Sequence, residues 1–155
     1  MEALRTGWDG LMTRVREYMD MNEKRNIFAA MAAGVLFFTG WWIIIDVAAR
    51  YGSEQFHWAY HLFGVFGTVS FIIVNSISNS QLRDDSFGAS DPRAAKIWLL
   101  IGFILGFSAL TGSIWVLISE FSASNVEKYP GIALLFQNIL IFTGSLAFKF
   151  GRIEE

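Results

Sequence analysis

The side chains in this sequence that could bind a metal ion or transfer a proton are few and widely spaced. His57 and His61 stand four residues apart, so a helix would place both imidazoles on one face, where a metal ion can bind. Two ligands do not complete a metal site, and a third would have to come from Asp46, Glu54 or Glu120. Because both histidines share the stretch HWAYH with two aromatic residues, we interpret them instead as amphipathic residues at a membrane–water interface.

Two adjacent amides, Gln137 and Asn138, lie inside an otherwise apolar run of the chain. Uncharged amides at such positions usually hydrogen-bond to a neighbouring helix, and we predict that role for both. The alternative is that they line a polar cavity, or contact a lipid headgroup or a partner protein. Both amides are therefore candidate contact residues.

Asp46 ends the stretch LFFTGWWIIID, in which residues suited to lipid or to a protein core precede a carboxylate. Counted from Ile27, it lies about 28 Å along a helix, at the far edge of a hydrocarbon layer about 30 Å thick. Arg50 follows at i+4, where an ion pair can form. We therefore predict that this pair is structural and marks the exit of a span; a binding carboxylate that faces a bundle is the alternative. Lys149 is predicted to extend its ammonium group to the headgroups.

The sequence contains none of the common catalytic motifs. It has no cysteine, which excludes disulfides and thiol chemistry. It has no nucleotide-binding motif, no Ser/His/Asp set and no HExxH. No charged residue lies near the middle of an apolar run, where ion-coupled transporters and proton relays usually carry one. We therefore expect no enzyme, no cofactor and no nucleic-acid partner.

Four nearly uncharged runs must position these residues. They cover 27–49, 60–77, 97–118 and 132–148, and each has roughly the 17–25 residues that a helix needs to cross the hydrocarbon core. The composition agrees, because 54% of the 155 residues are hydrophobic and they occur in blocks. The sequence therefore predicts an all-α membrane protein, with a four-helix transmembrane bundle over 27–155 and a separate segment over 1–26.

Basic residues are concentrated on one side of the four predicted spans. The other side carries only Arg50 and Lys128. The positive-inside rule then places both termini in the cytosol. The basic residues of the first side are Arg5, Arg14, Arg16, Lys24, Arg25, Arg83, Arg93, Lys96, Lys149 and Arg152.

Residues 1–21 carry one apolar stripe at spacings of three and four, as an amphipathic helix does. The segment is too charged to span a membrane, so the stripe must be buried in the cytosolic membrane interface or on a protein, and we favour the interface. Residues 22–26 would then form a bend into the first span. The stripe consists of Leu4, Trp8, Leu11, Met12, Val15, Tyr18 and Met19, of which Trp8, Leu11 and Val15 are candidate contacts with lipid or a partner.

Two further patterns concern the third and fourth spans. The stretch SDPRAAKIW offers Ser90 or Asp91 as an N-cap with Pro92 in the first helical position, and KYPGIALLF gives Pro130 the same role. A small-residue face on the third span predicts close packing, either within the chain or with a partner. That face consists of Gly102, Gly106, Ala109 and Ser113.

Three longer stretches combine polar and apolar residues more specifically than a generic membrane sequence: EKRNIFAAMAAGVLFFTGWWIIID, SISNSQLRDDS and YPGIALLFQNILIFTGSLAFKFGR. From about Asn22 to the C-terminus, the chain resembles the transmembrane protein 50 family. The N-terminal segment departs from the family pattern. The resemblance implies a four-span protein of the endoplasmic reticulum, Golgi or endosomes. It also implies a part in transport to the vacuole or lysosome, together with a small four-span protein of the leptin-receptor-overlapping-transcript family.

Three functions compete on these grounds. The first is an accessory subunit that packs against other integral membrane proteins and lipids, in a hetero-oligomeric complex that supports sorting or stability. The second is a subunit of a lipid-transfer or lipid-scrambling assembly at the endoplasmic reticulum, and the third is a small-solute channel or carrier. A dry bundle with an apolar outer face would favour the accessory subunit. A polar groove open to the bilayer would favour the lipid-handling subunit, and a water-filled path through the chain would favour the channel or carrier.

Overall fold

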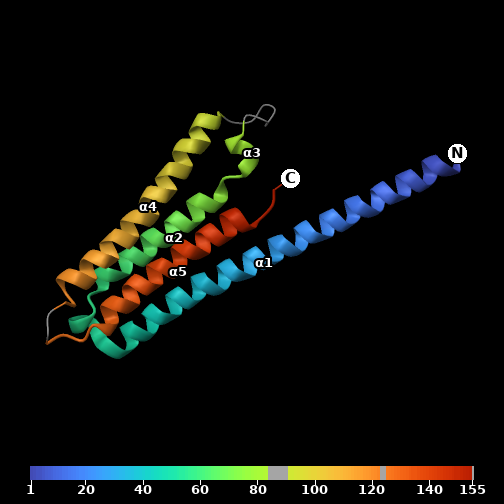
Figure 1. The fold of residues 1–155 in the computed structure, drawn as a ribbon. Helices are drawn as coiled ribbons and strands as arrows, with labels where there is room; N and C mark the ends of the chain where they lie inside the picture. Colours follow the sequence, from blue (N-terminus) through green and yellow to red (C-terminus); the bar gives the residue numbers. More distant parts are fainter. Residues whose placement is uncertain (84–90, 123–124, 155) are drawn as a thin grey trace.

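The computed structural model describes residues 1–83, 91–122 and 125–154, and the elements in these ranges are helical (Figure 1). Four helices are long and apolar enough to cross a membrane, as the sequence predicts. The long helices are α1 (Glu2–Gln55), α2 (His61–Ser76), α4 (Pro92–Ser119) and α5 (Tyr129–Gly151); a 3-10 turn, η1 (Trp58–Tyr60), leads into α2, and a short helix, α3 (Asn79–Leu82), follows it.

The predicted start signals lie where the third and fourth spans begin. Asp91 caps α4, because its carboxylate accepts a hydrogen bond from the Arg93 amide at 2.9 Å, and Pro92 is the first helical residue. Ser90, the other candidate for the cap, lies outside the described residues. Pro130 lies in the first turn of α5, where its missing amide hydrogen costs nothing.

Helix α5 is the centre of the bundle. It packs along α1 on one side and contacts α2 and α4 on the other (Figure 1). Helices α2 and α4 also pack against each other, whereas α1 packs mainly along α5. A larger share of α5 is buried than of any other span, so the polar side chains of α5 are the ones most enclosed by protein.

The small-residue face of α4 packs inside the chain. A Cβ atom added at Gly102 would lie 2.8 Å from Cγ2 of Ile73, and one added at Gly106 would lie 2.7 Å from Oγ of Ser70 and 2.9 Å from the ring of Phe142. Gly102 and Gly106 therefore pack against α2 and α5 within the chain, which is one of the two alternatives that the sequence leaves open. The buried residues of α4 are Gly102, Gly106, Ala109, Ser113 and Val116.

Helix α1 continues without a break from the N-terminal segment into the first span. Its one non-helical residue is Gly52, near its far end, where φ is 61°. The bend predicted for residues 22–26 is therefore wrong. The stretch NEKRN has no glycine or proline to break a helix, and Arg25 and Asn26 are held by hydrogen bonds to the C-terminal tail. Residues 2–21, here called the arm, consequently project past the bundle with every residue exposed (Figure 1).

The opposite end of α1 forms the ion pair that the sequence predicts. Nε of Arg50 lies 3.0 Å from a carboxylate oxygen of Asp46, and both side chains are partly exposed. Beyond Gly52 the chain turns, so that Phe56 is buried under the bundle. The core at this end consists of Ile44, Val47, Phe56, Val116, Phe121, Ala133 and Leu134.

The packing of α4 leads to a paired test. Gly106→Val should destabilise the bundle by roughly 1–3 kcal/mol, because the added methyl groups overlap Ser70 and Phe142. Gly34→Ala, where nothing lies within 4 Å of the added Cβ, should instead be neutral or stabilise by up to about 1 kcal/mol. Thermal unfolding in detergent, followed by circular dichroism, measures both effects. Equal stabilities for the two variants would contradict the packing described for α4.

Candidate functional site

Gln137 and Asn138 lie at the most enclosed positions of the bundle, with 0% and 2% of their surfaces exposed. Both amides face helix α2 where it carries glycine. The amide of Gln137 occupies the space that a side chain at Gly64 would need, and Oδ1 of Asn138 would lie 3.2 Å from a Cβ at Gly67. Gly40 of α1 likewise approaches the backbone oxygen of Gln137. Two glycines of α2 thus make room for the two amides, and Gly40 lets α1 approach the backbone of α5.

The interhelical hydrogen bonds predicted for these amides do not form. Asn138 donates from Nδ2 to the carbonyl oxygen of Leu134 in its own helix at 3.0 Å. Both polar atoms of the Gln137 amide, and Oδ1 of Asn138, have no hydrogen-bond partner among the described residues. The physical reason is that the glycines opposite have no side chain to offer, and the carbonyl of Gly64 already accepts a hydrogen bond from Thr68.

Other polar side chains, which the sequence analysis passed over, do connect the helices. Trp41 of α1 donates from Nε1 to Oγ1 of Thr68 at 3.1 Å. Ser70 of α2 donates to the carbonyl oxygen of Gly102 in α4 at 2.6 Å. In the sequence, each of these residues is compatible with a lipid-facing position. Their hydrogen bonds to other helices become evident only when the positions of those helices are known.

Lys149 lies at the end of the bundle that carries both termini, and its side chain is enclosed by protein instead of extending to the headgroups. Only 3% of its surface is exposed, and its ammonium group donates to the carbonyl oxygen of Ile77 just beyond α2. The prediction that this side chain reaches the headgroups is therefore wrong. The last carbonyls of a helix lack partners within the helix and attract positive charge, so the end of α2 offers a competing site inside the protein.

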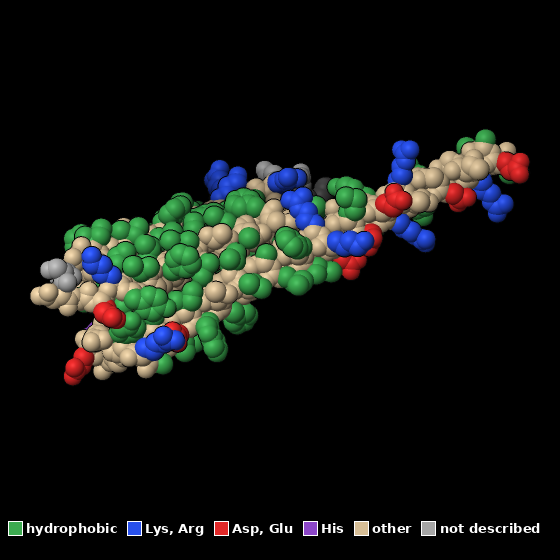
Figure 2. Space-filling model, turned by 60° about the horizontal axis from the view of Figure 1, so that its bottom comes forward, with side chains coloured by type: hydrophobic (Ala, Val, Ile, Leu, Met, Phe, Trp, Pro, Cys, Tyr) green, Lys and Arg blue, Asp and Glu red, His purple; other side chains and the backbone are tan. Residues whose placement is uncertain are grey.

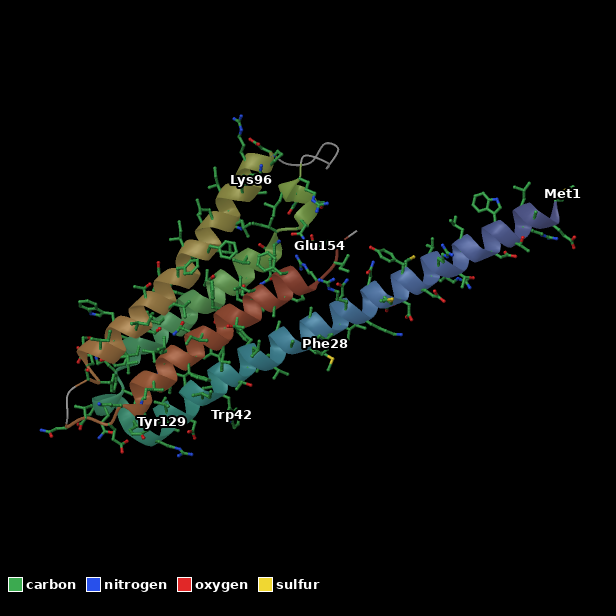
Figure 3. The ribbon with its side chains drawn as sticks, viewed as in Figure 1. Met1, Phe28, Trp42, Lys96, Tyr129 and Glu154 are labelled. Atoms are coloured by element: carbon green, nitrogen blue, oxygen red, sulfur yellow. The ribbon has the colours of Figure 1, made fainter. Side chains whose placement is uncertain are left out.

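The tail after α5 adds a second cation to the same end of α2. Arg152 donates from Nη2 to the carbonyl oxygens of Asn75 at 3.2 Å and Ile77 at 3.4 Å, and it forms an ion pair with Glu154. Glu154 in turn accepts a hydrogen bond from the backbone amide of Asn79, at the start of α3. Figure 3 shows Glu154 where the tail leaves α5, between α3 and α1.

The tail is also bound to α1, at the base of the arm. Arg25 donates from Nε to the carbonyl oxygen of Gly151 at 2.9 Å. The side chain of Asn26 donates to the carbonyl oxygen of Ile153 at 2.9 Å and accepts from its amide at 2.6 Å, as a neighbouring strand would. The hydrogen bonds of Lys149 and of the tail, here called together the tail clamp, join α1, α2, α3 and α5 at one end of the bundle. They involve Arg25, Asn26, Asn75, Ile77, Asn79, Lys149, Gly151, Arg152, Ile153 and Glu154.

The two histidines do not share a ligand position. Nδ1 of His57 accepts a hydrogen bond from the Ala59 amide at 3.3 Å and so caps η1, while the ring of His61 packs against Phe56. In the described ranges, no three His, Asp or Glu side chains stand close enough to hold a metal ion.

The candidate residues thus fall into separate regions. Gln137 and Asn138 lie in the middle of the bundle, Lys149 lies in the tail clamp, and Asp46 and Arg50 lie at the far end. The three candidates on the arm lie beyond the bundle, with 65%, 55% and 45% of their surfaces exposed; they are Trp8, Leu11 and Val15. Among the described residues, polar side chains meet in the tail clamp and between helices, and the candidate residues do not share one site.

The clamp gives a specific prediction about stability. Lys149→Met keeps the aliphatic stem but removes the charged donor to Ile77, so it should destabilise the protein by about 1.5–3 kcal/mol. Lys96→Met, at an exposed position near the start of α4, is the matched control and should change stability by less than about 0.5 kcal/mol. Thermal unfolding in detergent measures both. A Lys149→Met protein as stable as the control would show that the ammonium is solvated at the headgroups after all.

Comparison with known proteins places the clamp and the spans in a family. The family described as "Uncharacterised protein family (UPF0220)" matches residues 10–155. The chain is 28% identical over 138 residues to the Transmembrane protein 50 homolog of Dictyostelium discoideum, covering 79% of this chain and 88% of that one. It is 33% identical over 130 residues to a UPF0220 protein of Schizosaccharomyces pombe, covering 74% of each chain.

A third relative is Vacuolar protein sorting-associated protein 68 of Saccharomyces cerevisiae, which is 28% identical over 130 residues, or 70% of this chain and 69% of that one. No solved structure matches the chain. The family match takes in all four spans and the tail clamp, and the transmembrane protein 50 name expected from the resemblance occurs among the relatives. The chain therefore belongs to the UPF0220 family, which is the family of the transmembrane protein 50 relatives.

Proposed function

We propose that the chain is a non-enzymatic accessory subunit of a larger membrane assembly, and that it supports the sorting or stability of other membrane proteins on the route to the vacuole or lysosome. The relative named Vacuolar protein sorting-associated protein 68 supports the choice of pathway. The endomembranes from the endoplasmic reticulum to endosomes are the compartments in which such an assembly would work, with both termini of the chain in the cytosol.

The observation that carries this proposal is that the two amides within α5, Gln137 and Asn138, are enclosed by protein. Gln137 and Asn138 fit against glycines of α2 and are almost fully buried, so they meet neither lipid nor a water-filled path. A chain that moved lipids or solutes would need such groups on an open surface. The outer surfaces of the spans instead provide apolar side chains against which lipid or other helices can pack.

The outer face of the bundle is apolar and aromatic (Figure 2). Phe28, Trp42 and Trp115 each expose about three quarters of their surface there. Phe28 and Trp42 point away from the bundle along α1 (Figure 3). Such a face suits lipid tails and equally suits the helices of other membrane proteins, which associate by van der Waals contact.

The alternatives of a lipid-handling subunit and of a small-solute carrier find less support. A cavity of about 520 Å³ does carry polar side chains, but it lies at the far end of the bundle and not along its lipid-facing side. It is lined by Tyr51, Glu54, Gln55, His57, Tyr60, Glu120, Phe121, Asn125, Val126, Glu127 and Pro130.

Purification from native membranes in a mild detergent tests the proposal. We expect other integral membrane proteins to co-purify with the chain in constant ratio. In parallel, the purified chain is reconstituted into vesicles, and lipid scrambling and solute release are compared with those of protein-free vesicles. A chain that purifies alone, or that scrambles lipid or releases solute, would refute the accessory role.

The variant Gln137→Leu tests whether the buried amide serves helix packing or acts on a transported ligand. It removes two polar atoms that have no hydrogen-bond partner and keeps a similar volume, so stability should not fall by more than about 1 kcal/mol. Co-purification and vacuolar sorting should persist. Gly64→Leu, which would overlap Gln137, is the disruptive control and should destabilise the bundle. Loss of sorting in a stable Gln137→Leu protein would show that the amide acts on a ligand.

A further inference from the structure

The arm carries an apolar stripe that the described residues of the chain leave exposed. The arm projects past the bundle (Figure 1), and the stripe side chains expose between 45% and 70% of their surfaces. In proteins, most of the stability of an amphipathic helix comes from packing of its apolar face. The exposed stripe side chains are Leu4, Trp8, Leu11, Met12, Val15, Tyr18 and Met19.

The direction of the arm decides what can cover the stripe. Arg25 is hydrogen-bonded to Gly151 and Asn26 to Ile153, so α1 leaves the bundle in line with its span. A helix that continues straight out of the bilayer carries its stripe away from the lipid. The membrane that holds the bundle therefore does not cover the arm in this conformation.

The spacing of the stripe matches helix pairing. Leu4, Trp8, Leu11, Val15 and Tyr18 follow one another at intervals of four, three, four and three residues. This alternation is the a/d repeat of a coiled coil, in which the seam stays on one side because the repeat is 3.5 residues. Leu4, Leu11 and Tyr18 occupy d positions, and Trp8 and Val15 occupy a positions.

The charges of the arm are sorted around that seam. Two of the three arginines of the arm flank the seam, because Arg5 falls at an e position and Arg14 at a g position, whereas Arg16 falls at a b position on the outer side. None of the carboxylates falls at an e or g position. Glu2, Asp9, Glu17 and Asp20 fall at b, c and f positions on the outer side, where Asp20 forms an ion pair with Lys24 at 2.9 Å.

We propose that the arm pairs with an amphipathic helix of a partner subunit, one that carries carboxylates beside its own apolar seam and projects from the same face of the membrane. This inference rests on the proposed accessory role and names the chemistry of the partner. A second copy of this chain fits less well. Two copies in one membrane would pair in parallel, which would bring Arg14 to Met19 of the other copy and no carboxylate to either arginine.

Matched variants of the full-length chain in native membranes test the seam and its flanks. Trp8→Glu with Leu11→Glu should lower the co-purified partner at least about tenfold, because two charges enter the seam. Thr6→Glu with Thr13→Glu adds the same charge at f positions and should retain the partner. Arg5→Glu with Arg14→Glu should lose it, whereas Arg5→Lys with Arg14→Lys should keep it. Unchanged thermal unfolding of the bundle in each variant shows that the arm alone was altered.

Cross-linking identifies the molecule that covers the apolar seam of the arm. The chain has no cysteine, so Leu11→Cys places a photoactivatable maleimide in the seam and Thr13→Cys places one on the outer side. We expect Leu11→Cys alone to cross-link, to a partner helix with Asp or Glu beside its apolar residues. A cross-link to lipid, to residues 1–21 of a second copy, or equally from both positions would overturn the proposal.

The same experiment separates this inference from the proposed function. If the wild-type chain brings down no membrane protein, the accessory role fails and the arm proposal fails with it. If it brings down partners that all four double variants retain, the accessory role stands and the arm is not the contact.

Discussion

The bundle depends on the close approach of its backbones to α5. Helices in lipid gain little from the hydrophobic effect between them, so they associate through van der Waals contact and a small number of hydrogen bonds. Glycine permits that contact here: a Cβ at Gly40 would lie 3.1 Å from the backbone oxygen of Gln137, and one at Gly144 would lie 3.2 Å from that of Ala33. The same closeness encloses the two amides. A larger residue at Gly64 or Gly67 would push α2 away from α5 and open the interior to lipid.

The features that sequence reasoning predicted correctly are those that depend on local periodicity. The four spans follow from the length of each apolar run, and the start of α4 follows from Asp91 and Pro92. The ion pair between Asp46 and Arg50 needs only the rise of one helix. The helix cap and the ion pair each join groups less than two turns apart, and each span follows from its own run of residues. None of these features requires knowledge of the other helices.

The features that could not be predicted depend on which helices are neighbours. Lys149 bonds to a carbonyl 72 residues away, and nothing around it in the sequence indicates that the end of α2 lies within reach. Gln137 was expected to find a donor or acceptor on the next helix, but the residues that face it are glycines. The straight course of α1 depends on Arg25 and Asn26 meeting a tail more than 120 residues later. Four polar side chains from the stretches that suggested the family meet in the tail clamp, although they lie far apart in the sequence; they are Arg25, Asn26, Lys149 and Arg152.

The unbroken course of α1 makes the position of the arm depend on the tilt of the first span. A span tilts when its apolar length exceeds the thickness of the surrounding bilayer, and endomembranes differ in thickness by several ångströms. The arm is about 30 Å long, so a change of about 10° in the tilt of α1 would move its tip by roughly 5 Å. The hydrogen bonds between Asn26 and the tail hold α1 straight at the base of the arm. The helix therefore does not bend at the membrane surface, and the tip moves with the span. The reach of the arm toward other proteins is thereby coupled to the thickness of the membrane in which the bundle resides.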